Sequence, residues 1–100
     1  MVTHIVMWNL LESLSDQQKE SAAAAMKKNL EDLNGKIEGL ESIRLHTEAI
    51  DPSNRSLTLI AKFRTKEDLL SYIDHPEHKR VGKTYVRPFV QERACMNFED

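Results

Sequence analysis

The sequence of 100 residues contains one cysteine, three glycines, three prolines and no long apolar run. The single Cys95 cannot form an internal disulfide, which excludes a disulfide-stabilised scaffold and fits a reducing compartment. No segment approaches the roughly eighteen consecutive apolar residues of a membrane span. The first residues also lack the basic and apolar regions of a signal peptide. We therefore expect a cytoplasmic protein with no membrane partner.

Basic residues are not in excess. The chain carries 14 Lys and Arg against 16 Asp and Glu, and the two signs are mixed along it. This distribution offers no basic surface to a nucleic acid or an anionic membrane. A composition with 40% hydrophobic and 30% charged residues is typical of a globular protein. We expect one domain, spanning residues 1–100, with a single core.

Apolar periodicity predicts four strands and two helical regions. The strands are expected at residues 2–9, 40–50, 57–63 and 89–98, the middle two forming a hairpin. Ser15 and Gln18 form a capping-box pattern before the first helix, and Gly35 is a natural stop for it. The apolar stripe of this helix consists of Ala22, Met26, Leu30, Leu33 and Ile37.

The second helical region is expected to begin at Thr65 and to break at Pro76. Proline ends one helix and is well suited to the first position of the next, where its missing N–H costs nothing. The second piece is expected to continue to about Arg87. The last strand is then expected to place four apolar residues on one face: Val90, Ala94, Met96 and Phe98.

The order β-α-β-β-α-β predicts an α+β, ferredoxin-like protomer. Its four-stranded antiparallel sheet would carry both helices on one face. The first strand is apolar on both faces, however, with Val6 and Trp8 on one and Ile5 and Met7 on the other. Since an open sheet face is normally polar, we expect two sheets to meet across a two-fold axis. The result would be a homodimer.

Residues 72–78 hold two of the four histidines and one of the two tyrosines. Imidazole and phenol groups can move protons or orient a hydroxyl near neutral pH. A helix that begins at Pro76 would place His78 on one face with Val81, Gly82 and Tyr85. The sequence therefore predicts the functional site at this helix junction.

A metal site at the junction is the first alternative. His75 and His78 lie three residues apart, beside Asp74 and Glu77, which resembles the spacing of metal ligands. Pro76 separates the two histidines, and a third ligand would have to come from a distant strand. We therefore expect no metal and no other cofactor.

Several polar residues are expected to have no ligand role. His46 is predicted to lie on the surface, and Arg93 to be available for an acidic residue of a neighbouring strand or subunit. The charges of the first helix are predicted to form a solvated face: Lys19, Lys27, Lys28, Glu31 and Asp32. Cys95 is expected to be an ordinary half-buried strand residue rather than a nucleophile.

Three segments resemble the stress-responsive dimeric α/β-barrel (Dabb) family. They are His4-Ile5-Val6-Met7-Trp8, Tyr72-Ile73-Asp74-His75-Pro76-Glu77-His78 and Arg87-Pro88-Phe89-Val90-Gln91-Glu92-Arg93. The similarity runs through nearly the whole chain. It implies a ferredoxin-like protomer whose sheet joins that of a second copy, with the helices outside.

Plant members of this family include polyketide cyclases that close an aromatic ring without a metal or organic cofactor. Their pocket lies between sheet and helices, and its polar groups match His4, Tyr72 and His78 of this chain. His75 matches as a structural residue at the helix junction. The cyclases carry large aromatic side chains in the first helix, where this chain has Ala22, Ala23 and Met26. The resemblance therefore implies a pocket of a different shape.

We expect a homodimer that binds a small apolar or aromatic molecule in a pocket whose polar groups are His4, Tyr72 and His78. The expected lining consists of Val6, Trp8, Met26, Leu59, Val81, Gly82 and Tyr85. The alternative is a cofactor-independent cyclase, isomerase or monooxygenase with His78 as general acid/base. Tyr72 would then polarise a carbonyl oxygen, and His4 would orient the substrate. In a purely structural interpretation, His78 caps a helix and Tyr72 belongs to the core.

Overall fold

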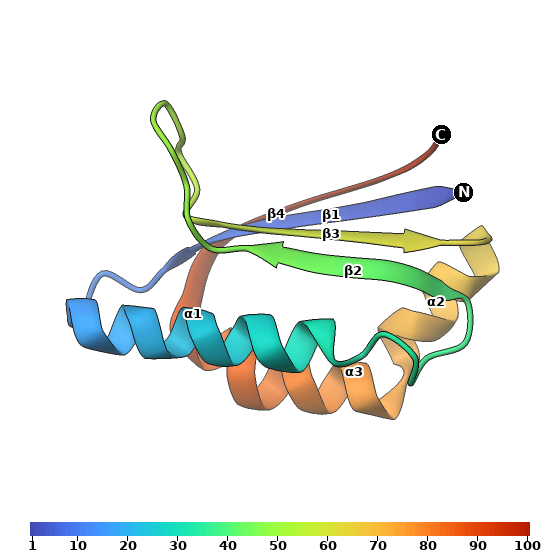
Figure 1. Ribbon diagram of the computed structural model, residues 1–100, viewed down its shortest axis with the longest axis horizontal. Coiled ribbons are helices and arrows are strands. Elements are labelled where there is room, and N and C mark those ends of the chain that lie inside the picture. Colours follow the sequence, from blue (N-terminus) through green and yellow to red (C-terminus); the bar gives the residue numbers. More distant parts are fainter.

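The computed structural model describes residues 1–100 and has two layers, a sheet and the helices that cover one of its faces (Figure 1). The elements are β1 (Val2–Leu10), α1 (Asp16–Glu31), β2 (Leu40–His46), β3 (Leu57–Phe63), α2 (Lys66–Asp74), α3 (Pro76–Val81), a π-helical turn η1 (Gly82–Val86), a 3-10 turn η2 (Arg87–Phe89) and β4 (Val90–Glu99). The strands are antiparallel in the order β2-β3-β1-β4. This confirms the ferredoxin-like protomer and the β2–β3 hairpin. None of the helices combines the length and apolarity needed to span a membrane.

One apolar core of 18 buried residues fills the space between the sheet and the helices. The strands supply it with alternate side chains, as the period of two requires. In β3 these are Leu57, Leu59, Ala61 and Phe63, all buried as expected. The stripe of α1 meets them from the other side through Met26 and Leu30.

Local capping fixes the starts of both long helices. The Ser15 hydroxyl accepts from the Gln18 N–H at 3.1 Å, and the Gln18 side chain accepts from the Ser15 N–H at 2.8 Å. Thr65 accepts from the Asp68 N–H at 3.1 Å in the same way. Each bond satisfies a backbone donor that the first helical turn leaves free.

The end of α1 differs from the prediction. The helix ends at Glu31, before the expected stop at Gly35, which has a positive φ of 88°. Short turns follow, in which the Leu33 N–H bonds to Leu30 and the Lys36 N–H to Leu33. These turns keep Leu33 and Ile37 buried without a regular helix.

The strand β2 is shorter than predicted and lies at an edge of the sheet. Its pairing with β3 stops at His46, so residues 47–50 are not strand. The Lys27 ammonium donates to the Leu45 carbonyl at 3.0 Å, and the Glu31 carboxylate accepts from the Leu45 N–H at 2.9 Å. Lys27 and Glu31 therefore do not belong to a purely solvated helix face. Their side chains form hydrogen bonds with backbone N–H and C=O groups that an edge strand otherwise leaves unpaired.

A β-bulge divides β4 into two parts. Met7 lies opposite Ala94 but Asn9 lies opposite Gln91, so β4 contains one extra residue. Glu92, at this position, has a positive φ of 57°. The bulge shifts the side-chain alternation by one residue, and Val90 packs against the core on the helix side of the sheet. The prediction that Val90 shares a face with Ala94 is therefore wrong.

Beyond the bulge, the two faces of β4 differ in chemistry. Ala94, Met96 and Phe98 lie opposite Met7, Ile5 and Thr3 of β1, on the face that no helix covers. The intervening residues Arg93, Cys95 and Asn97 lie on the helix side of the sheet, where they border a cavity. The bulge thus positions the residues from which the site is built.

Candidate functional site

The junction of α2 and α3 is built around His75 and Pro76. His75 ends α2, with its N–H bonded to the Tyr72 carbonyl at 3.1 Å. It also caps α3, since its Nδ1 accepts from the Glu77 N–H at 3.1 Å. Pro76 occupies the first position of α3. The predicted structural role of His75 is confirmed, and the chain turns here so that His78 faces the sheet.

A cavity of about 410 Å³ lies between the β1–β4 half of the sheet and the helical segment that follows Pro76. Its apolar wall includes Val6, Trp8, Leu30, Leu59, Gly82 and Val86. Its polar groups are His4, His78, Arg87, Arg93, Cys95 and Asn97. A hollow with apolar walls and a few converging polar groups is the usual form of a small-molecule site.

His4 is held in one orientation from β4. Its Nδ1 lies 2.5 Å from the Asn97 side-chain oxygen. Because a carbonyl oxygen only accepts, Nδ1 carries the proton, and Nε2 of the neutral ring is left as an acceptor. Burial lowers the pKa of His4, the Asn97 hydrogen bond acts against this, and the Arg93 charge lowers the pKa further. His4 is therefore a neutral imidazole at pH 7.

His78 has the same tautomer for the same reason. Its Nδ1 donates to the Ile73 carbonyl at 3.2 Å, which leaves Nε2 as an acceptor. Burial lowers the pKa of His78, the Ile73 hydrogen bond opposes this, and His4, Arg87 and Arg93 lower it further by charge repulsion. The site thus holds two neutral imidazoles, each with one free basic nitrogen.

Tyr72 contacts both imidazoles but does not line the cavity. Its ring centroid lies 4.2 Å from that of His78 and 6.0 Å from that of His4. The side chain is fully buried, and its hydroxyl has no hydrogen-bond partner. Burial also raises the pKa of Tyr72 far above its usual range, so the hydroxyl stays protonated. The Tyr72 hydroxyl is therefore a hydrogen-bond donor without an acceptor.

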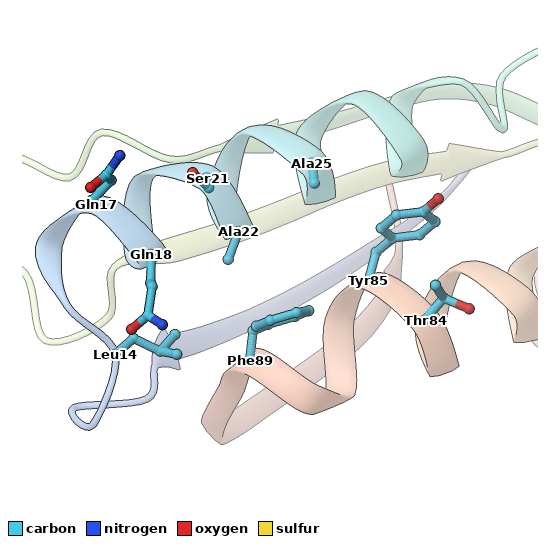
Figure 2. Close-up of a pocket in the computed structure, with 9 residues that line it drawn as sticks. All are labelled: Leu14, Gln17, Gln18, Ser21, Ala22, Ala25, Thr84, Tyr85 and Phe89. Atoms are coloured by element: carbon cyan, nitrogen blue, oxygen red, sulfur yellow. The ribbon is translucent and has the colours of Figure 1, made fainter.

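The other predicted lining residues divide into three groups. Val6, Trp8, Leu59 and Gly82 border the cavity together with the two histidines. Met26 and Val81 are completely buried in the core and do not reach the cavity wall. Tyr85 lines a different hollow (Figure 2).

The position of Tyr85 follows from the π-helical turn. The prediction used regular α-helical spacing, which would align His78, Gly82 and Tyr85. The turn Gly82–Val86 instead bonds the Arg87 N–H to the Gly82 carbonyl, five residues back. The wider turn holds more residues per revolution than an α-helix, so Tyr85 is rotated away from the cavity.

The second hollow is a groove of about 570 Å³ between α1 and the turns η1 and η2. Figure 2 shows Ala22 and Ala25 on one side of it, with Tyr85 and Phe89 on the other. The small side chains of α1 leave this space open on the helical side of the molecule. The groove contains neither of the paired histidines and is separate from their cavity.

Sequence reasoning missed four polar residues of the cavity: Arg87, Arg93, Cys95 and Asn97. Cys95 is exposed rather than half-buried, and its side of β4 opens onto the cavity. Strand alternation places Arg93, Cys95 and Asn97 on one face of β4. Only the register against β1 shows that this face is the one that carries His4. No three His, Cys, Asp or Glu side chains lie close enough together to hold a metal.

Solved structures of other proteins share this fold. A dimeric ferredoxin-like protein of unknown function from Bacteroides fragilis is 26% identical, with a TM-score of 0.90 over 99% of this chain and 95% of that one. A Dabb family protein from Mesorhizobium loti is 16% identical, with a TM-score of 0.75 over 99% and 95% of the two chains. A hydroxynitrile lyase from Passiflora edulis is 17% identical, with a TM-score of 0.72 over 97% and 90%.

None of the curated proteins compared with the chain matches it in sequence. The family model of the stress responsive A/B barrel domain (Dabb), in contrast, matches residues 2–100. This range contains every element of the fold and the whole cavity. The chain therefore belongs to the stress responsive A/B barrel domain family.

Proposed function

We propose that this protein is a homodimer that binds a small molecule with an apolar or aromatic body in the cavity between His4 and His78. The observation that carries the proposal is the cavity itself. It offers about 410 Å³ beside Trp8, Val6 and Leu59, with both imidazoles at its edge. Aromatic and aliphatic walls favour an apolar body, while the few polar groups fix its orientation.

The uncovered sheet face supports the homodimer. It carries Ile5 and Ile60, which lie opposite each other, together with Met7, Met96 and Phe98. Met96 is 66% and Phe98 37% exposed, and both lie on β4. A contiguous apolar surface of this kind marks an interaction site. The Bacteroides fragilis relative is described as dimeric, which fits pairing of the same face with a second copy.

Binding can be followed through the only tryptophan. Trp8 borders the cavity, so its indole N–H gives a single NMR cross-peak that reports on occupancy. We expect 2-naphthamide, a neutral aromatic probe, to shift this peak saturably. The variant Gly82→Leu is expected to abolish the shift, because a Cβ added at Gly82 meets nothing within 4 Å and Gly82 forms part of the cavity wall, which a leucine would fill.

The variant Ala25→Leu is the matched control. It adds the same kind of side chain to the groove of Figure 2 and leaves the histidine cavity unchanged. An unchanged titration in Ala25→Leu with a lost one in Gly82→Leu supports the proposal. A saturable shift that survives in Gly82→Leu but disappears in Ala25→Leu would assign binding to the groove instead.

A cofactor-independent enzyme is the second candidate, favoured by the two free Nε2 atoms. His78 would remove a proton from carbon beside a carbonyl group, and the Tyr72 hydroxyl would donate to the carbonyl oxygen as charge develops there. Because the Tyr72 hydroxyl is buried, the site favours the binding function over catalysis. Catalysis requires this hydroxyl to reach the cavity, from which it is closed off here.

Exchange of protons for deuterium tests the enzymatic candidate without a known substrate. If His78 is a base, the protein accelerates deuterium uptake at the methyl group of 2-acetylnaphthalene in D₂O. The acceleration should disappear in His78→Ala and persist in His46→Ala, which changes an exposed histidine outside the cavity. Equal uptake with and without protein would remove the enzymatic role.

A further inference from the structure

Two arginines from different elements border the histidine cavity. Arg87 comes from η2, and Arg93 comes from β4 immediately after the bulge at Glu92. The chain changes from helical turns to an extended strand between them, and this brings both side chains to the same hollow. No Asp or Glu lines that hollow, so its charge is entirely positive.

Neither arginine is neutralised within the protein. The seven ion pairs of the structure use Lys27, Lys28, Lys62, Arg64 and Arg80 as their cations. Arg64 alone lies near three carboxylates, whereas Arg87 and Arg93 have none. Their fields nevertheless reach the site, because both charges lower the pKa of His78. The cavity is therefore positively charged, although the whole chain has a net charge of −2.

We propose that the ligand of this cavity carries a carboxylate, which Arg87 and Arg93 bind while Trp8 and its apolar neighbours hold the rest of the molecule. The inference rests on the proposed binding function and adds the chemical class of the ligand. A guanidinium presents a planar fork of donors that matches the two oxygens of a carboxylate. Beside an apolar wall, such a charge-assisted pair is stronger than in open water.

The neutral imidazoles are consistent with this arrangement. His4 and His78 add no positive charge at pH 7, so the two guanidinium groups are the charges that an anion meets. A single carboxylate on an aromatic or aliphatic body would balance part of their charge. A neutral ligand of the same shape would leave both arginines without a counterion. The preference for the anion should therefore be measurable as a ratio of two affinities.

The test compares 2-naphthoate with 2-naphthamide, which have nearly the same shape and differ in charge. Both are titrated into the 100-residue protein at low salt, with the Trp8 indole cross-peak as the readout. We expect 2-naphthoate to bind about tenfold more tightly, which corresponds to about 1.4 kcal/mol. The ratio should fall to about one in the double variant Arg87→Gln/Arg93→Gln. It should remain in Arg80→Gln, which removes a charge of α3 that pairs with Glu77 outside the cavity.

The outcomes separate the two proposals. Equal affinities of the two probes in the wild-type protein would overturn the carboxylate inference and leave the binding function intact. A tenfold preference that survives in the double variant would overturn the assignment to Arg87 and Arg93. Binding of neither probe would overturn the proposed function and this inference with it. The thermal unfolding transition of each variant shows whether a lost signal reflects lost folding.

Discussion

The ring of Tyr72 packs against the imidazole of His78 with the centroids 4.2 Å apart and the planes inclined by 43°. This contact connects the core to the cavity. Tyr72 also packs against Phe63, with a centroid separation of 4.9 Å, so it belongs to the main aromatic cluster. His78 is thus supported from behind by a side chain that is itself immobilised by the core.

The hydroxyl of Tyr72 gives the first prediction. Because it is buried without a partner, Tyr72→Phe should leave the free energy of unfolding unchanged or raise it by about 1 kcal/mol. Tyr72→Ala should lower it by about 3–5 kcal/mol through the loss of aromatic packing. Urea unfolding measures both. A clear destabilisation by Tyr72→Phe would show that the hydroxyl is bonded in solution.

The stability should depend on pH through the two cavity histidines. Burial lowers the native pKa of His4 and His78 below the unfolded value of about 6.5. The unfolded chain therefore takes up more protons as the pH falls through this value. The free energy of unfolding should be fully present above about pH 6.5 and should decrease below it.

Urea midpoints between about pH 5 and pH 8 measure this dependence. The variant His78→Gln should reduce the slope, while His46→Gln, which changes an exposed histidine, should keep it. A flat profile for the wild-type protein over this range would contradict the assignment of two neutral imidazoles with lowered pKa values.

The uncovered sheet face gives a prediction about association. Met96→Glu should convert the proposed homodimer into a monomer, because it places a charge in the proposed apolar interface. Light scattering at several concentrations measures the change. The control is Ala24→Glu, which adds the same charge at an exposed position of α1, on the helical layer. A wild-type protein that is monomeric, or a Met96→Glu variant that remains dimeric, would contradict the predicted interface.

Two glycines allow backbone strain to be separated from steric overlap. Gly35 and Gly39 have nearly the same positive φ, 88° and 87°, but a Cβ added at Gly35 meets nothing while one at Gly39 overlaps the Asp68 side chain. Gly35→Ala should cost about 1–2 kcal/mol, the penalty of the left-handed conformation. Gly39→Ala should cost more, since Asp68 must also move. Equal unfolding free energies for the two variants would show that Asp68 moves freely.

Local signals in the sequence predicted the order and starts of the elements. Ser15, Thr65 and Pro76 each act through bonds or dihedral limits within a few residues, and all three begin helices as expected. The errors occur where tertiary packing selects a less common backbone. The wide turn at Gly82 and the bulge at Glu92 have no pattern that alternation or helical spacing detects.

The candidate site was predictable to a similar extent. His4, Tyr72 and His78 were expected from the family resemblance, and the structure brings all three side chains into contact through their rings. Sequence alone does not give the register of β4 against β1, so it does not show that Arg93 borders the cavity. Asn97 was missed for the same reason, although it fixes the tautomer of His4.

The bulge at Glu92 also determines which positions of β4 would affect each face of the sheet in a mutational scan. Beyond it, odd-numbered substitutions change the cavity beside the two histidines, and even-numbered ones change the sheet face that no helix covers. Before it the parity is inverted, since Val90 belongs to the core side. Phenotypes plotted along the strand would therefore alternate with a period of two and shift phase once, at Glu92. Ordinary alternation lets this ten-residue strand contribute to the cavity and to the uncovered face from interleaved positions, and the one added residue sets which positions serve which.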